Sequence, residues 1–116
     1  SPDGTRLGLE VKRGESTHIA VVPSGGGEVV QLTEDPGQAW PFSWAPDGDR
    51  IAFAGYRDGL WNLYWVSAST RQTSPVTSNR KMNAYLRYPS WSPLGSSLVY
   101  EYAEATGNVW MLDVGR

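Results

Sequence analysis

The chain has 116 residues and a formal net charge of −2, with 12 acidic and 10 basic side chains. This length suits a single domain, and the lack of a basic excess argues against a nucleic-acid partner. The sequence contains no cysteine, so it has no disulfide framework, and no apolar run is long enough for membrane insertion.

The first third of the chain predicts three strands. It opens with the turn phrase Ser1-Pro2-Asp3-Gly4, in which proline sets φ, aspartate accepts backbone hydrogen bonds and glycine takes a positive φ. Apolar runs rich in β-branched residues follow, which is typical of strands. We expect these strands at residues 6–11, 17–22 and 28–33. Residues 25–27 are all glycine and indicate a hairpin turn, since the lysine and helix of a phosphate-binding loop are missing.

The middle third predicts four short antiparallel strands. A second turn phrase, Ala45-Pro46-Asp47-Gly48, separates the first two strands, and Arg57-Asp58-Gly59 is a hairpin signal. We expect the strands at residues 40–44, 50–55, 60–67 and 74–77. The last of them contains Pro75, which a sheet tolerates mainly at an edge.

The final third repeats this order. Ser92-Pro93-Leu94-Gly95 is a third copy of the turn phrase, although Leu94 replaces the aspartate of the other copies. We expect strands at residues 85–91, 97–102 and 108–113. The change at Leu94 bears on the geometry of one turn and not on the fold. No segment has sustained helical periodicity, so almost no helix is expected.

The three turn phrases recur at a spacing of roughly 45 residues, which indicates one supersecondary unit repeated along the chain. Such a unit is stable only when neighbouring copies cover its faces. Trp44 and Trp91 precede the second and third phrases at equivalent positions, so we expect both to pack between repeats. The same packing role is expected for Trp61, Trp65 and Trp110.

The order of these motifs resembles a known repeat. The sequence Pro-x-Trp-Ser-Pro-Asp-Gly, then Arg-Ile-Ala-Phe, an Arg-Asp-Gly turn, Leu-Tyr-Trp-Val and Gln-Leu-Thr is similar to the TolB-type, WD-repeat-like β-propeller repeat. The resemblance covers nearly the whole chain. It is specific for the propeller blade and unspecific for function, because this repeat serves proteins with unrelated activities.

The resemblance implies an all-β fold made of β-propeller blades, each with four antiparallel strands. About two and a half blades are expected, as a partial propeller arc. Blade 1 is expected at residues 1–37 without its first strand, blade 2 at residues 38–83, and blade 3 at residues 84–116 without its last strand. Further blades are expected from a longer parent chain or from another copy, as an oligomer. The resemblance also implies a periplasmic or cell-envelope location in a bacterium.

No set of residues indicates catalysis or a metal. His18 is the single histidine, and residues 14–18 lack the second glycine and the helix of a nucleophile elbow. Zinc requires several histidine or cysteine ligands. Asp47 and Asp49 could supply two oxygen ligands for calcium, but turn chemistry explains them better. We therefore expect a noncatalytic protein with no cofactor and no metal.

A binding site for a protein or peptide is expected in the loops that join successive blades. Trp40 lies in the predicted loop at residues 34–41, and a second connection covers residues 78–88. Aromatic and arginine side chains are enriched in binding hot spots. The candidate residues are Trp40, Arg80, Lys81, Asn83, Tyr85 and Arg87.

The sequence leaves two other interpretations open beside this binding or scaffold module. The blades could belong to the propeller of a prolyl-oligopeptidase-like peptidase, in which case a Gly-x-Ser-x-Gly hydrolase domain is expected downstream. Alternatively, the chain could be a structural or engineered propeller fragment that closes by oligomerisation. The mass of the chain in solution separates this last interpretation from the other two.

Overall fold

The computed structural model describes residues 1–105 and the backbone of residues 109–115, and this part of the chain contains strands and no helix. The strands are β1 (Arg6–Arg13), β2 (Ser16–Pro23), β3 (Val30–Gln31), β4 (Gln38–Trp44), β5 (Arg50–Arg57), β6 (Leu60–Ser67), β7 (Thr73–Pro75), β8 (Ala84–Trp91), β9 (Ser97–Glu104) and β10 (Val109–Gly115). The all-β prediction is therefore confirmed. The side chain of Trp110, expected to pack between repeats, lies outside the described residues.

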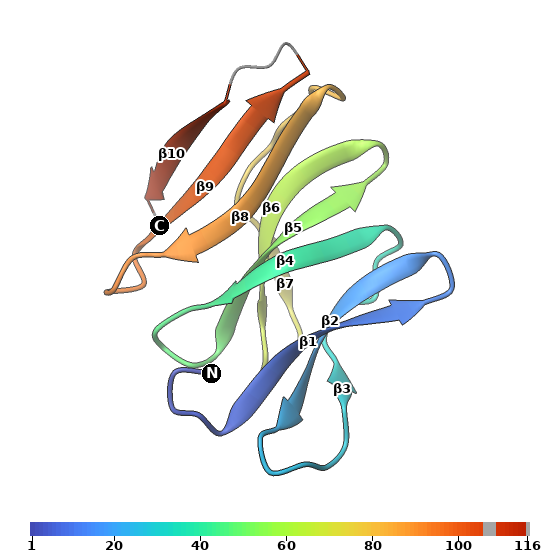
Figure 1. Cartoon of the computed structure of the whole chain (residues 1–116), viewed down its shortest axis with the longest axis vertical. Coiled ribbons are helices and arrows are strands. Elements are labelled where there is room, and N and C mark those ends of the chain that lie inside the picture. The colour runs from blue at the N-terminus through green and yellow to red at the C-terminus, as the bar shows by residue number, and fades with distance from the viewer. Residues whose placement is uncertain (106–108, 116) are drawn as a thin grey trace.

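The strands form three antiparallel sheets, which we call blade 1 (β1-β2-β3), blade 2 (β4-β5-β6-β7) and blade 3 (β8-β9-β10). The sheets fan out with blade 2 between the other two (Figure 1). The outermost strands of blades 1 and 2 are shorter than the strands expected at residues 28–33 and 74–77. Strand β3 has two residues and β7 has three. Both are edge strands, and short edges limit pairing with other chains. Pro75 lies in β7, at the edge that its missing N–H requires.

The three turn phrases have the same backbone geometry. Gly4, Gly48 and Gly95 have φ angles of 74°, 75° and 74°. In each turn this glycine donates its N–H to the carbonyl three residues earlier, at 2.9 to 3.0 Å. Leu94 therefore does not alter its turn, because the positive φ of the glycine sets the geometry and the aspartate only adds side-chain hydrogen bonds.

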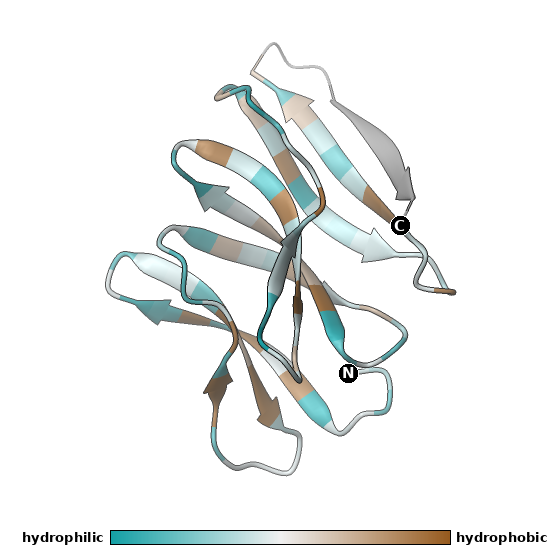
Figure 2. Cartoon of the chain, turned by 180° about the vertical axis from the view of Figure 1, so that it is seen from behind, coloured by the Kyte–Doolittle hydropathy of each residue, from teal (hydrophilic) through white to brown (hydrophobic). Residues whose placement is uncertain are grey.

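Two apolar cores hold the blades together. Between blades 1 and 2, Ile19, Val21 and Leu32 pack against Ile51 and Phe53. On the other face of β5, Ala52 and Ala54 pack against Leu86, Leu98 and Tyr100 of blade 3, with Trp61, Trp65 and Trp91 around them. Residues 51–54 are fully buried, since both faces of this strand are covered. Polar and apolar residues alternate in bands along many of the coloured strands in Figure 2.

An arginine at the start of β1 links blade 1 to blade 2, and an arginine at the start of β5 links blade 2 to blade 3. Arg6 donates to the carbonyl of Gly48 and lies over Trp44, with its guanidinium carbon 5.2 Å from the ring centroid. Arg50 donates to the carbonyl of Gly95 at 3.0 Å and lies 4.5 Å over Trp91. We call this contact the arginine clasp. It confirms that Trp44 and Trp91 pack between blades.

In blades 1 and 2, the residue four positions after the turn glycine faces the following blade. Gly8 occupies this position in β1, and a Cβ there would lie 2.5 Å from the ring of Phe42. Ala52 and Val99 occupy the equivalent positions in β5 and β9. The side chain at this position thus grows from blade 1 to blade 3.

Candidate functional site

Trp40 lies in strand β4, which agrees with the strand expected at residues 40–44 and not with the loop expected at residues 34–41. Strand β4 already begins at Gln38, which pairs with Tyr56, and Trp40 sits at a bulge after Ala39. Pairing starts this early because Gly37 passes very close to the chain of β5: a Cβ at Gly37 would lie 2.0 Å from the carbonyl oxygen of Tyr56. The Trp40 side chain is 39% exposed.

Tyr85 and Arg87 lie together on one face of β8. Their neighbours in sequence, Ala84 and Leu86, are buried against blade 2. Successive side chains of a strand point to opposite faces, so Tyr85 and Arg87 are directed away from blade 2. Tyr85 is 41% exposed. The strand therefore separates a packing face from a face with polar and aromatic side chains.

Arg87 is the centre of this exposed group. Its guanidinium carbon lies 5.4 Å from the ring centroid of Tyr85 and 5.7 Å from that of Tyr88, within range of cation–π attraction. Its Nη2 atom is 3.8 Å from a carboxylate oxygen of Glu101, which is long for a hydrogen bond. Its buried Nε atom has no hydrogen-bond partner among the described residues. We call Tyr85, Arg87, Tyr88 and Glu101 the β8 cluster.

The connection between blades 2 and 3 is pinned to β6 by two asparagines. Asn79 donates its backbone N–H to Oδ1 of Asn62 at 2.6 Å and its side-chain amide to the carbonyl of Trp61 at 3.0 Å. The Thr77 hydroxyl donates to the same Asn62 oxygen at 2.8 Å. These bonds hold a loop that lacks regular structure of its own. Asn62 is 8% exposed, so its amide is well shielded from water.

Lys81 is anchored to blade 3. Its Nζ atom lies 2.9 Å from Oε1 of Glu104, which also accepts a hydrogen bond from the hydroxyl of Tyr102 at 2.7 Å. These two hydrogen bonds lower the pKa of Glu104 below its ordinary value. Glu104 pairs with Ala84 across the sheet, so this ion pair belongs to the face of blade 3 turned toward blade 2.

The structure brings together only part of the predicted site. Tyr85 and Arg87 are in contact, whereas the carbonyl of Asn83 accepts a hydrogen bond from the N–H of Ala105. Arg80 is exposed and makes no side-chain hydrogen bond or ion pair with the described residues. No contact joins Trp40 to this group within the described part of the chain.

Sequence reasoning missed Tyr88 and Met82, which are 50% and 74% exposed. Tyr88 was counted in a strand, but its φ of 56° marks a bulge that turns its ring outward. The aromatic residue next to Pro89 carries a weak signal for such a bulge. Met82 lies beside the hairpin tip at Gly59, a contact between segments that the sequence does not reveal.

His18 is a packed residue in blade 1. It is 5% exposed, and its Nδ1 atom lies 3.2 Å from the hydroxyl oxygen of Thr33. Burial lowers the pKa of His18, and the positive charges of Arg13 and Arg57 act in the same direction. Across residues 1–105, no group of three or more acidic, histidine or cysteine side chains is arranged to hold a metal ion. The same region contains no helix that could cross a membrane.

Sequence comparison finds one relative named TolB and one uncharacterised relative. The chain is 31% identical over 78 residues to the Tol-Pal system protein TolB of Syntrophus aciditrophicus, covering 64% of this chain and 17% of that protein. It is 28% identical over 118 residues to an uncharacterised protein of Agrobacterium fabrum, covering 98% of this chain and 38% of the relative. The chain thus spans less than half the length of these relatives. No family model matches the sequence.

Structural comparison gives the same fold. TolB from Acinetobacter baumannii superposes with a TM-score of 0.81 at 17% identity, over 99% of this chain and 28% of the other. A structure from Agrobacterium tumefaciens, provisionally named TolB, gives 0.80 at 21% identity, over 99% and 48%. Puromycin hydrolase matches with a TM-score of 0.71 at 20% identity, over 97% of this chain and 19% of the hydrolase. The propeller fold is therefore shared with proteins of different activity. Taken together, the repeated turn phrase, the sequence relatives and these superpositions show that the chain has the β-propeller fold of TolB-type proteins.

Proposed function

We propose that the chain is a noncatalytic binding module that docks a protein or peptide through the β8 cluster. The observation that carries this proposal concerns Arg87, whose half-buried guanidinium lies near two exposed tyrosines. The Nε–H of Arg87 has no acceptor among the described residues. A buried donor without an acceptor costs free energy, and a partner carbonyl or carboxylate would remove that cost.

The chemistry around Arg87 suits recognition of a polypeptide. Tyr85 and Tyr88 offer large rigid surfaces with polar tips, and tyrosine and arginine dominate binding hot spots. Glu101 faces Arg87 at a distance that leaves room for a competing acceptor. Arg80 is exposed and forms no ion pair with the described residues, so it adds positive charge on the adjoining connection and favours an acidic partner segment.

The partner class follows from the relatives. One of them is named as a TolB of the Tol-Pal system, which makes the proteins of that system the first partners to test. The corresponding location is the bacterial periplasm. A complete propeller would include further blades, from the same chain or from another copy.

The test is a binding assay with the 116-residue chain and the Tol-Pal system proteins of Syntrophus aciditrophicus, immobilised one at a time. We expect Arg87→Ala and Tyr88→Ala each to weaken binding at least tenfold, which is about 1.4 kcal/mol. Arg13→Ala is the matched control, because this exposed arginine lies at the end of β1 in blade 1, and it should leave the affinity unchanged. Equal affinity of Arg87→Ala and the unchanged chain, with both folded by circular dichroism, would rule out the β8 cluster.

A further inference from the structure

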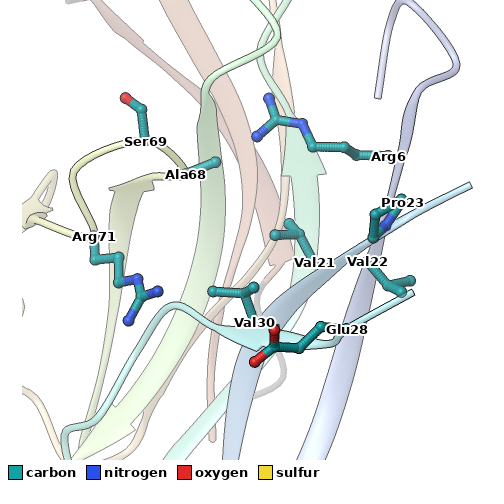
Figure 3. A pocket seen from close by; sticks show the side chains of 9 residues that line it. All are labelled: Arg6, Val21, Val22, Pro23, Glu28, Val30, Ala68, Ser69 and Arg71. Carbon is teal, nitrogen blue, oxygen red and sulfur yellow. The ribbon is translucent and has the colours of Figure 1, made fainter. Parts of the chain in front are cut away.

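A cavity of about 450 Å³ opens at the outer rim, between blades 1 and 2 and away from the β8 cluster. Figure 3 shows Val21 and Val30 at its centre, with Glu28 beside them and the guanidinium of Arg71 on the opposite side. Pro23 and Ala68 contribute to the two walls. We call this hollow the rim cavity. It combines an apolar floor with one negative and one positive side chain at its mouth.

The walls of the rim cavity are held by hydrogen bonds. On the blade 2 side, Asp49 accepts from the Ser67 hydroxyl at 2.6 Å and from the Ser69 N–H at 2.9 Å. These bonds lower the pKa of Asp49, so it stays ionised and keeps the turn in place. On the blade 1 side, the Ser24 N–H donates to the carbonyl of Thr5 at 2.9 Å. A site with fixed walls loses little conformational entropy when a ligand binds.

The two charges at the mouth remain available. Neither Arg71 nor Glu28 forms an ion pair with the described residues, although both line the same cavity. Arg6, the other cation of the lining, is already occupied by the arginine clasp. Arg71 also borders a smaller polar hollow with Glu34 and Asp35, but Asp35 is paired with Arg57 at 3.0 Å. Arg71 is thus the cation of the rim cavity that can receive an anion.

We propose that the rim cavity binds a carboxylate carrying a branched apolar group, and that the occupant is the C-terminal residue of a peptide. Its carboxylate would pair with Arg71, its side chain would lie on Val21 and Val30, and its backbone N–H would donate to Glu28. A free aliphatic acid shares the first two features and lacks the third. The presence of Glu28 therefore favours the peptide. This site is separate from the proposed β8 cluster and does not depend on it.

Fluorescence polarisation of a labelled Gly-Ser-Ala-Val-Leu peptide with a free C-terminus tests the proposal on the 116-residue chain. The same peptide with a C-terminal amide and unlabelled octanoate as competitor form the other arms. We expect the free acid to bind at least tenfold more tightly than the amide, and octanoate to compete only weakly. Equal binding of acid and amide would overturn the site, and octanoate as strong as the peptide would overturn the peptide as occupant.

Arg71→Gly is the informative variant. Arg71 has a φ of 63°, which glycine adopts without strain, so this change removes the guanidinium and preserves the turn. We expect it to weaken peptide binding at least tenfold, and Glu28→Gln to weaken it about threefold. Lys12→Ala is an exposed control in blade 1 that should change nothing. Amide chemical shifts should move at Val30 and Ser69, and shifts confined to blade 3 would contradict the assignment.

Discussion

His18 shows how one buried side chain can set the response of the fold to pH. Its ring is enclosed in blade 1 next to Thr33, whose hydroxyl oxygen also accepts the N–H of Ile19 at 3.1 Å. Burial, with Arg13 and Arg57 nearby, keeps its pKa below the ordinary value of 6.5, against the opposing charges of Asp35 and Glu34. The unfolded chain therefore binds a proton at a pH where the folded chain does not.

This difference predicts a loss of stability in mildly acidic solution. The contribution of neutral His18 to the free energy of unfolding is complete above the pKa of about 6.5 that this histidine has in the unfolded chain. The contribution declines as the pH falls from there toward the lower pKa of His18 in the folded chain, because protonation favours the unfolded state. His18 is the single histidine of the chain, so His18→Gln should abolish the decline between pH 7.5 and 5.5. Urea unfolding at a series of pH values measures how the free energy of unfolding changes with pH in the two proteins. A slope of the same size in the variant would show that another group is responsible.

At the scale of elements, the arginine clasp joins strands that are far apart in sequence. Arg50 makes three contacts at once: an ion pair with Asp47 at 2.6 Å, a hydrogen bond to the carbonyl of Gly95, and the face of Trp91. A planar guanidinium can satisfy all three, whereas the ammonium of lysine acts as a point charge. The shape of the arginine, and not only its charge, is therefore needed at the junction of blades 2 and 3.

We expect Arg50→Ala to lower the free energy of unfolding by about 2 kcal/mol, the combined worth of a charged hydrogen bond and a cation–π contact. Arg50→Lys should recover less than half of that loss. Lys12→Ala, at an exposed site, should stay within about 0.5 kcal/mol. Denaturant unfolding followed by tryptophan fluorescence gives these values. A lysine variant as stable as the unchanged chain would show that charge alone suffices.

Strands that have turn residues at both ends could be predicted well from the sequence. Strand β6 has the predicted limits, residues 60–67, because a Gly-containing hairpin and a polar turn bracket it. Strand β3 is much shorter than residues 28–33 because an outer edge strand pairs on one side, and its length depends on a neighbour that the local sequence does not specify. The start of β4 at Gln38, inside the predicted loop, was missed because it depends on the contact of Gly37 with Tyr56, a long-range feature.

The candidate site was less predictable than the fold. Residue type pointed to Tyr85 and Arg87, and the structure does bring these two together. The contribution of Tyr88 depends on a bulge, and the unmatched Nε of Arg87 depends on how β8 and β9 are packed. The rim cavity could not be predicted at all, because Glu28 and Arg71 belong to different blades and meet only through stacking.

At the scale of the whole molecule, blade 2 is covered on both faces, and blades 1 and 3 each pack one face against it. Stability of a stacked array is the sum of each unit and its interfaces with neighbours. The middle sheet takes part in both apolar cores, with Ile51 and Phe53 on one side and Ala52 and Ala54 on the other. Blade 2 should therefore be the last of the three sheets to unfold.

Native-state hydrogen exchange should report this gradient. We expect the amides of β5 and β6 to exchange only through global unfolding, since residues 51–54 and Leu63 are fully buried. The amides of β3 should exchange at least a hundredfold faster, through local opening of an edge strand with two residues. Uniform protection across the three sheets would contradict a stack of separately opening blades.

The growth in side-chain size from Gly8 through Ala52 to Val99 makes the order of the three segments directional. Moving the segment of β8–β10 ahead of β4–β7 would set the isopropyl group of Val99 against the ring of Phe42, where even one added methyl carbon at Gly8 would come within 2.5 Å. In a chain shuffled in this way, the ring of Phe42 would have to move before these two blades could pack as closely as blades 1 and 2 do. Exchange of segments between positions would therefore favour a small residue wherever Phe42 follows.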